Sequence, residues 1–281
     1  MDNLHFGHKM ESGVTVPNYS YVFHFEQEFI HSEIKPLFDT YWRQVCIYSA
    51  GLYFLLIIVG QQYMAARPRF EIRNCLTAWN IFLALFSIMG AARTLPEFLH
   101  VLKTHGIYHS VCIPSFIESD KVSGFWTLMF VLSKVPELGD TVFIVLRKQP
   151  LIFLHWYHHM TVLLYAWYSY SEYTAAARWF IVMNYIVHSV MYSYYAFKAL
   201  KFRVPRSISM VITALQLVQM VVGCLVNFWV IQMKQSSLEC HVSDQNIKFS
   251  LLMYTSYFVL FGRFFYNAYL ANQLALKSKS V

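Results

Sequence analysis

The sequence predicts an all-α membrane protein with seven transmembrane helices. Apolar residues make up 57% of the 281 residues and charged residues only 13%, which is about half of the charged share of an ordinary soluble domain. The apolar residues also gather in long runs, each close to the ~20 residues that a helix needs to cross a bilayer. The expected spans are residues 45–65, 75–95, 124–146, 154–170, 178–198, 208–232 and 249–271.

The stretches outside these spans are short and polar. We therefore divide the chain into a luminal N-terminal tail (residues 1–43), one seven-helix domain (44–271) and a cytosolic tail (272–281). The connections between the spans are too short to hold a separate soluble domain, so a single domain is expected.

Basic residues predict the orientation of the spans. The connections after the first, third and fifth spans hold more of them than the connections after the second, fourth and sixth spans, and the C-terminal tail adds two more. Those in the first set of connections and in the tail are Arg67, Arg69, Arg73, Arg147, Lys148, Lys198, Lys201, Arg203, Arg206, Lys277 and Lys279. Because positive charges favour the cytosolic side, we expect these connections and the C-terminus in the cytosol and the N-terminus in the lumen. Lys277 and Lys279 also resemble a dilysine retrieval signal, which predicts the endoplasmic reticulum membrane.

Two features agree with this orientation. Asn18 opens the sequon Asn18-Tyr19-Ser20, which is a glycosylation site only on the luminal side. Cys112 and Cys240 fall in the two long connections expected on that side, where the compartment permits a disulfide. Asn18 is therefore a candidate glycosylation site, and we predict that Cys112 pairs with Cys240.

The fourth span opens with His155, His158 and His159. On a helix, spacings of three and four residues put the three imidazoles on one face. Imidazole among apolar residues costs free energy unless the ring has a partner or a chemical role. The cluster therefore indicates a metal site or nucleophile and base chemistry, and the alternative is a polar cap at the entrance of a helix.

Polar side chains in neighbouring spans are further candidates. An ionised group costs roughly 2.5–3.5 kcal/mol at the centre of a transmembrane helix, so these side chains should face the interior. The third span carries Lys134, Glu137 and Asp140, the fifth carries Asn184, His188 and Tyr192, and the sixth carries Thr213, Gln216 and Gln219. We expect Lys134 to pair with Glu137 and the carboxylates to orient histidines, whereas Gln219 is expected to hold helices together.

Four ordered motifs resemble those of the very-long-chain fatty acid elongases. They are Lys134-x-x-Glu137-x-x-Asp140-Thr141, His155-x-x-His158-His159, Asn184-x-x-x-His188-x-x-Met191-Tyr192 and Thr213-x-x-Gln216-x-x-Gln219. The resemblance runs from about residue 40 to residue 271 and is strongest to palmitoyl-type members over residues 130–170. It implies that helices 2–7 form a barrel around an acyl tunnel closed at the luminal end, with helix 1 at the periphery.

The resemblance also implies an activity, the 3-oxoacyl-CoA synthase reaction that begins microsomal elongation. A long-chain acyl-CoA of the C16 type, saturated or monounsaturated, reacts with malonyl-CoA to give 3-oxoacyl-CoA, CoA and carbon dioxide. We expect neutral His158 to attack the thioester and form an acyl-imidazole; a direct reaction is the alternative. His188 and Asn184 would stabilise the enolate or oxyanion. His155 and His159 would bind the malonyl carboxylate or orient His158.

Other residues are expected to support this chemistry. The set that holds the catalytic groups is Lys134, Glu137, Asp140, Tyr192 and Gln216. The candidates for binding CoA phosphates are Arg147, Lys148, Lys201, Arg203, Arg206 and Arg263. For the loop residues among them, setting the membrane orientation is the alternative role, and for Arg263 it is snorkelling toward the interface.

The expected ligands are acyl-CoA, malonyl-CoA and membrane lipid, with no metal, no further cofactor and no nucleic acid. Contacts with the reductases and dehydratase of the elongation cycle are expected, and a homodimer is left open. Two other functions compete. A di-iron desaturase or hydroxylase needs more ligands than the four histidines within the spans, and a non-enzymatic seven-helix transporter or receptor leaves the histidine cluster unexplained.

Overall fold

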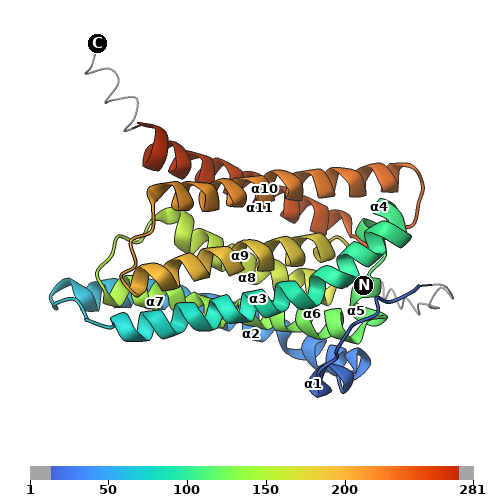
Figure 1. Cartoon of the computed structure of the whole chain (residues 1–281), viewed down its shortest axis with the longest axis horizontal. Helices are drawn as coiled ribbons and strands as arrows, with labels where there is room; N and C mark the ends of the chain where they lie inside the picture. The colour runs from blue at the N-terminus through green and yellow to red at the C-terminus, as the bar shows by residue number, and fades with distance from the viewer. Residues whose placement is uncertain (1–13, 272–281) are drawn as a thin grey trace, which may run out of the picture.

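Residues 14–271 are described by a computed structural model in which every regular element is a helix (Figure 1). In chain order these are α1 (His24–Gln27), α2 (His31–Ala65), α3 (Arg73–Thr104), α4 (Gly106–Cys112), α5 (Ser115–Glu118), α6 (Lys121–Ser133), η1 (Pro136–Leu138), α7 (Gly139–Leu146), α8 (Phe153–Ser171), α9 (Ala177–Ala199), α10 (Arg206–Gln235), α11 (Asp244–Phe265) and η2 (Tyr266–Leu270). The all-α class is confirmed for this part of the chain. Lys277 and Lys279 lie outside the described residues.

Three of these helices, α2, α3 and α10, are long and apolar enough to cross a membrane. The chain is therefore a membrane protein. The shorter or more polar helices lie beside these three, since α8 packs against α2, α9 against α3, and α11 against α10. The remaining crossings and the barrel stay predictions, because α6 is short and because histidines and other polar residues make α8 and α9 less apolar.

Three helix boundaries differ from the sequence expectation. α2 begins at His31 rather than near residue 45, and α3 continues to Thr104, past residue 95. The third expected span is interrupted: α6 ends at Ser133, a 3-10 turn covers Pro136–Leu138, and α7 begins at Gly139. Proline accounts for the interruption, because it has no N–H to donate and its ring crowds the preceding turn.

Two glycines allow helices to approach closely. A Cβ on Gly90 of α3 would lie 2.3 Å from the ring of Tyr185 on α9. A Cβ on Gly223 of α10 would lie 2.5 Å from the ring of Tyr254 on α11. Both distances are well inside van der Waals contact, so a larger residue would push the paired helices apart. Small residues commonly set such close packing between membrane helices.

The long helices run along the long axis of the molecule, so their connections collect at two ends (Figure 1). What we call the basic end holds the α2–α3, α7–α8 and α9–α10 connections. The opposite end, which we call the disulfide end, holds α4, α5 and the α10–α11 connection. The described chain starts at the disulfide end, and its last helix leads to the basic end.

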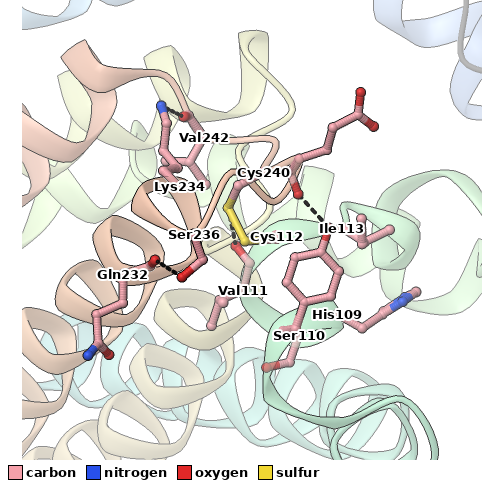
Figure 2. Close-up of a disulfide and its surroundings, with 12 residues drawn as sticks. His109, Ser110, Val111, Cys112, Ile113, Gln232, Lys234, Ser236, Cys240 and Val242 are labelled. Carbon is pink, nitrogen blue, oxygen red and sulfur yellow. Dashed lines mark hydrogen bonds between the residues drawn. A yellow bond between two sulfur atoms is a disulfide. The ribbon is translucent and has the colours of Figure 1, made fainter.

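A disulfide joins Cys112 at the end of α4 to Cys240 in the α10–α11 connection, as Figure 2 shows. The predicted pairing is therefore confirmed. Backbone contacts extend the junction, since the N–H of His241 donates to the carbonyl of Cys112 at 2.9 Å. The hydroxyl of Tyr108 donates to the carbonyl of Glu239 at 2.6 Å. Two connections that are far apart in the sequence are thus joined at one end of the bundle.

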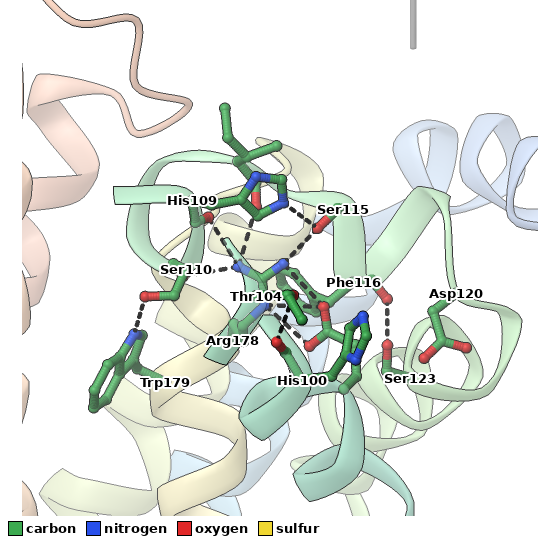
Figure 3. A network of polar contacts seen from close by, with 12 residues as sticks. His100, Thr104, His109, Ser110, Ser115, Phe116, Asp120, Ser123, Arg178 and Trp179 are labelled. Atoms are coloured by element: carbon green, nitrogen blue, oxygen red, sulfur yellow. Dashed lines mark hydrogen bonds and ion pairs between the residues drawn. The ribbon is translucent and has the colours of Figure 1, made fainter. Parts of the chain in front are cut away.

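A buried arginine organises the same end (Figure 3). Arg178 of α9 is 1% exposed and its Nε lies 3.0 Å from Oε2 of Glu97 on α3. Its guanidinium also donates to the carbonyls of His109, Ser110 and Ile113, which lie at the end of α4. Burial, helped by the nearby Arg178, lowers the pKa of His109 to about 4, so at neutral pH this imidazole adds no second charge. Sequence analysis did not single out Arg178 or Glu97.

Removing the disulfide should destabilise the protein. The bond spans a sequence separation of 128 residues, for which the chain-entropy treatment gives about 5 kcal/mol as an upper figure. We expect Cys112→Ser to lower the midpoint of thermal unfolding in detergent by several degrees. Cys75→Ser is the matched control, because Cys75 is a free, exposed thiol on α3 near the basic end. An unchanged midpoint in Cys112→Ser would contradict this role of the disulfide.

Candidate active site

The interruption between α6 and α7 holds a buried ion pair. Lys134 is 2% exposed and Glu137 is 4% exposed. The ammonium donates to Oε1 of Glu137 at 2.8 Å and to Oε2 at 3.1 Å, as the sequence predicted. It also donates to Oδ1 of Asn184 on α9 at 3.2 Å, while Ser133 donates to Glu137 at 2.7 Å. The break in the helix thus leaves two opposite charges side by side, with their polar atoms satisfied by neighbours.

The three histidines of α8 share one face, as their spacing predicts. The ring centroids of His155 and His159 are 4.4 Å apart, and those of His158 and His159 are 5.5 Å apart. Nε2 of His155 lies 3.0 Å from Oγ1 of Thr141 on α7. That hydroxyl lies 2.8 Å from the hydroxyl of Tyr53 on α2. His155 is therefore held by a relay of hydroxyls from two other helices.

His158 differs from its neighbours, because neither of its ring nitrogens has a hydrogen-bond partner among the described residues. Its ring packs against Tyr257 of α11, with centroids 4.8 Å apart, and Tyr257 also donates to the backbone carbonyl of His158 at 3.3 Å. The side chain is only partly buried. The ring of His158 is thus positioned by packing, and its nitrogens are free to meet a ligand.

Asp140 connects three helices around the histidines. It accepts hydrogen bonds from Nε1 of Trp79 on α3 at 2.6 Å and from the hydroxyl of Tyr192 on α9 at 2.8 Å. Its Oδ2 lies 3.9 Å from Nε2 of His159 on α8. Glu137, by contrast, makes its hydrogen bonds to Lys134 and Ser133. Of the two carboxylates expected to orient histidines, Asp140 is the one placed beside an imidazole.

The polar stripe of α9 completes the cluster. Nδ2 of Asn184 lies 3.2 Å from Nε2 of His188, and both side chains are buried. Because Asn184 also accepts from Lys134, it connects the Lys134–Glu137 ion pair to the imidazole of His188. The three expected groups of polar residues therefore meet in one place.

These residues line a cavity of about 400 Å³, which we call the histidine cavity. Its polar lining includes Asp140, His155, His158, His159, Asn184, His188, Tyr192, Lys198, Thr213, Gln216 and Gln219. Gln216 of α10 donates to Sδ of Met191 at 3.3 Å. Gln219, expected only to hold helices together, also faces this cavity and its apolar neighbour.

Two further cavities adjoin the histidine cavity. On the side of the basic end lies a cavity of about 500 Å³, the basic-end cavity, which shares Asp140, His155 and Lys198 with it. On the other side lies a narrow space of about 50 Å³, the apolar cavity, which shares His158 and Asn184 with it. The apolar cavity reaches Ile117 of α5 at the disulfide end. His158 therefore stands where the histidine cavity and the apolar cavity meet.

The predicted CoA-binding residues separate into two groups. Arg147 and Lys201 line the basic-end cavity, together with Arg73 and Lys198, which were expected only to set orientation. Lys148 instead donates to the carbonyls of Ala65 and Arg67 at the end of α2.

The other three candidates lie away from this cavity. Arg206 donates to the carbonyl of Ala268. Arg203 and Arg263 are exposed and line none of the three cavities. Within residues 14–271, no group of three or more His, Cys, Asp and Glu side chains is arranged to hold a metal ion.

Tyr53 and Trp79 are site residues that sequence analysis missed. Both are aromatic residues inside apolar spans, where most such residues only pack, so their hydrogen bonds to Thr141 and Asp140 had no sequence signal. Thr141 did have one, because it follows Asp140 within the first motif.

Comparison with known proteins adds an independent finding. Residues 37–277 match the model of ELO, the GNS1/SUR4 family. The chain is 61% identical to very long chain fatty acid elongase 6 of Drosophila melanogaster over 264 residues, which cover 93% of this chain and 83% of that protein. It is 51% identical to very long chain fatty acid elongase 6 of Gallus gallus and 50% identical to that of Homo sapiens, each over 248 residues, with 88% of this chain and 92% of the relative covered.

The buried ion pair yields a stability prediction. Glu137→Gln leaves the ammonium of Lys134 buried without its carboxylate, a change that costs about 3–5 kcal/mol for a buried pair. We expect a marked decrease in the midpoint of thermal unfolding. The double variant Lys134→Met with Glu137→Leu removes both charges and should recover most of the loss. If the double variant is as unstable as Glu137→Gln, the pair does not act as a compensated unit.

Proposed function

This chain belongs to the ELO (GNS1/SUR4) family and is a very-long-chain 3-oxoacyl-CoA synthase of fatty acid elongation, and we propose that it joins a C16-type acyl-CoA to malonyl-CoA through an acyl-imidazole on His158. The observation that carries the proposal is the position of His158. Its unpartnered ring stands at the junction between the histidine cavity and the apolar cavity. A thioester carbonyl at that junction would have its acyl chain on one side and its CoA on the other.

The proposal includes an orientation of the protein in the membrane. The chain crosses the endoplasmic reticulum membrane seven times, with the basic end in the cytosol and the disulfide end in the lumen. Three observations support this: the basic connections gather at one end, the disulfide lies at the other, and the sequon residue Asn18 is exposed. Disulfides and N-glycans both belong to the lumen. CoA thioesters then enter from the cytosolic side.

The two halves of the donor fit different surroundings. The phosphates of CoA bind in the basic-end cavity, where Arg73, Arg147, Lys198 and Lys201 supply positive charge. The acyl chain extends from the histidine cavity into the apolar cavity, whose lining includes Phe130, Phe180 and Tyr254. Burial of methylene groups, about 0.8 kcal/mol each, holds the chain there. Preference for saturated or monounsaturated C16 donors is part of this proposal.

The first chemical step forms the acyl-enzyme. The unprotonated nitrogen of neutral His158 attacks the thioester carbonyl, and the carbon–sulfur bond breaks. The CoA thiolate takes the proton that the acylated imidazole loses, and CoA leaves. Imidazole in a site of low dielectric constant is biased toward its neutral, nucleophilic form.

The second step forms the new carbon–carbon bond. Malonyl-CoA loses carbon dioxide, and the resulting enolate attacks the acyl carbonyl. The carbon–nitrogen bond to His158 breaks, 3-oxoacyl-CoA is released, and the departing imidazole nitrogen takes a proton from water, which restores neutral His158. His188, fixed by Asn184, stabilises the enolate or oxyanion, an interaction often worth about 3–4 kcal/mol. His155 and His159 bind the malonyl carboxylate before it leaves. The product is the substrate class of a reductase and then of a dehydratase in the same membrane.

The condensing activity is tested with purified protein, palmitoyl-CoA and labelled malonyl-CoA, without reductant. We expect a 3-oxoacyl-CoA two carbons longer than the donor, and a loss on the order of a thousand-fold or more in His158→Ala, because the nucleophile is gone. His24→Ala is the matched control, since the side chain of His24 is 82% exposed and lines none of the three cavities. No product from any donor in folded protein, with stoichiometric iron present, would instead support the oxygenase alternative.

The covalent route has its own test. Protein incubated with labelled palmitoyl-CoA alone should release one CoA and retain the acyl group on the peptide that contains His158, as read by mass spectrometry. His158→Gln should retain none. Efficient condensation without any acyl-protein under donor-only conditions would show that the enolate attacks the bound thioester directly.

A further inference from the structure

The residues before α2 form a docked element at the disulfide end, although they precede the stretch that matches the family, residues 37–277. We call residues 14–30 the N-terminal cap; it contains α1, which packs on α6 (Figure 1). The sequence predicted a polar tail here. The cap instead makes specific contacts with α3 and α6, close to the apolar cavity's end of the molecule.

A fully buried carboxylate anchors the cap. Glu26 is 0% exposed, although it lies on a helix of four residues near the start of the chain. Its oxygens accept from Nε of Arg93 at 2.8 Å, from Nε1 of Trp126 at 2.7 Å and from the backbone N–H of Phe23 at 2.9 Å. Arg93 belongs to α3 and Trp126 to α6, so one side chain holds the cap to two helices.

Further contacts fix the cap on both sides of this anchor. The hydroxyl of Tyr19 donates to Asp120, the N-cap residue of α6. The guanidinium of Arg93 lies 5.1 Å from the centre of the Tyr19 ring, a favourable cation–π distance. Lys121 donates to the carbonyl of Gln27 at 2.9 Å. The cap is therefore held at several points along its length.

One residue of the cap belongs to the same buried cluster as two residues that line the apolar cavity. Phe29 is 5% exposed and belongs to the same buried cluster as Ile117 and Tyr170. Ile117 and Tyr170 line the apolar cavity. A Cβ on Gly124 of α6 would lie 2.7 Å from the carbonyl oxygen of Ile117 and 3.1 Å from the ring of Phe29, so these parts are closely packed. Phe29 therefore packs in the same buried cluster as two residues of the cavity wall.

We propose that the N-terminal cap sets the upper limit of acyl chain length, with Phe29 supporting Ile117 and Tyr170 as the wall that stops the chain. The inference rests on the proposed function, in which the acyl chain lies in the apolar cavity. A wall of side chains yields to a longer chain unless the atoms behind it are fixed. Phe29 supplies those atoms, and Glu26 with its partners fixes the segment that carries Phe29.

The test compares Phe29→Ala with the unmodified chain. Phe29→Ala removes the support and leaves Glu26 and all three histidines of α8 in place. The quantity measured is kcat/KM for stearoyl-CoA divided by kcat/KM for palmitoyl-CoA. We expect this ratio to rise roughly tenfold, because the space opened accepts two more methylenes. Phe29→Leu should give an intermediate ratio. Phe25→Ala is the matched control, since Phe25 lies in the same cap and also contacts the ring of Phe125 but is 47% exposed and lies outside the buried cluster of Phe29.

Other results separate the two proposals. An unchanged ratio in active Phe29→Ala would overturn the role of the cap and leave the condensing activity standing. If the unmodified chain yields no product, the thermal stabilisation that palmitoyl-, stearoyl- and arachidoyl-CoA give each variant still tests the cap. A shift of the optimum to longer chains in Phe29→Ala then supports the cap, and an identical length dependence in both proteins overturns it. Should Phe29→Ala misfold, Phe29→Leu carries the same comparison.

Discussion

The structure depends on satisfying polar groups that apolar surroundings would otherwise penalise. Lys134 and Glu137 are both almost fully buried, and each makes its hydrogen bonds within a few residues or to one neighbouring helix. Pro136 makes this possible, because it ends the regular helix where the two side chains must turn toward each other. Asn184 then extends the pair to His188. A buried charge pair is weak evidence for stability, but each charge needs its partner because an uncompensated buried charge is costly, and here the partners belong to the site.

The same requirement positions the remaining imidazoles. His155 meets a hydroxyl of α7, and His159 lies beside a carboxylate that Trp79 and Tyr192 hold from α3 and α9. His158 is the exception, and it is the one at the junction of two cavities. Preorganised neighbours around one unpartnered ring are the arrangement that catalysis by positioned groups requires. The other polar residues therefore explain why His158 can be left free.

Sequence patterns predicted the site better than they predicted its supports. The histidine spacing and the four-residue intervals of α9 placed their side chains correctly, because helix periodicity is local. The pairing of Cys112 with Cys240 was predictable because both cysteines lie in connections expected on the same side of the membrane. Residues such as Glu26, Arg178 and Trp79 had no such signal, since their partners lie on helices whose neighbours no local pattern specifies. Lys148 and Arg206, two of the candidates for binding CoA phosphates, also donate to backbone carbonyls of other helices, and no local pattern specifies these contacts.

The position of the N-terminal cap along the chain has a consequence for how such enzymes diverge. Glu26 and Phe29 come before the stretch that carries all four motifs, yet Phe29 belongs to the same buried cluster as Ile117 and Tyr170, which line the apolar cavity. On the proposed role of the cap, a substitution there reshapes the end of the cavity without moving an imidazole. The limit on acyl chain length would then be encoded before the four motifs, and the condensing reaction within them. Substitutions in the cap could accumulate while selection keeps the motif residues unchanged.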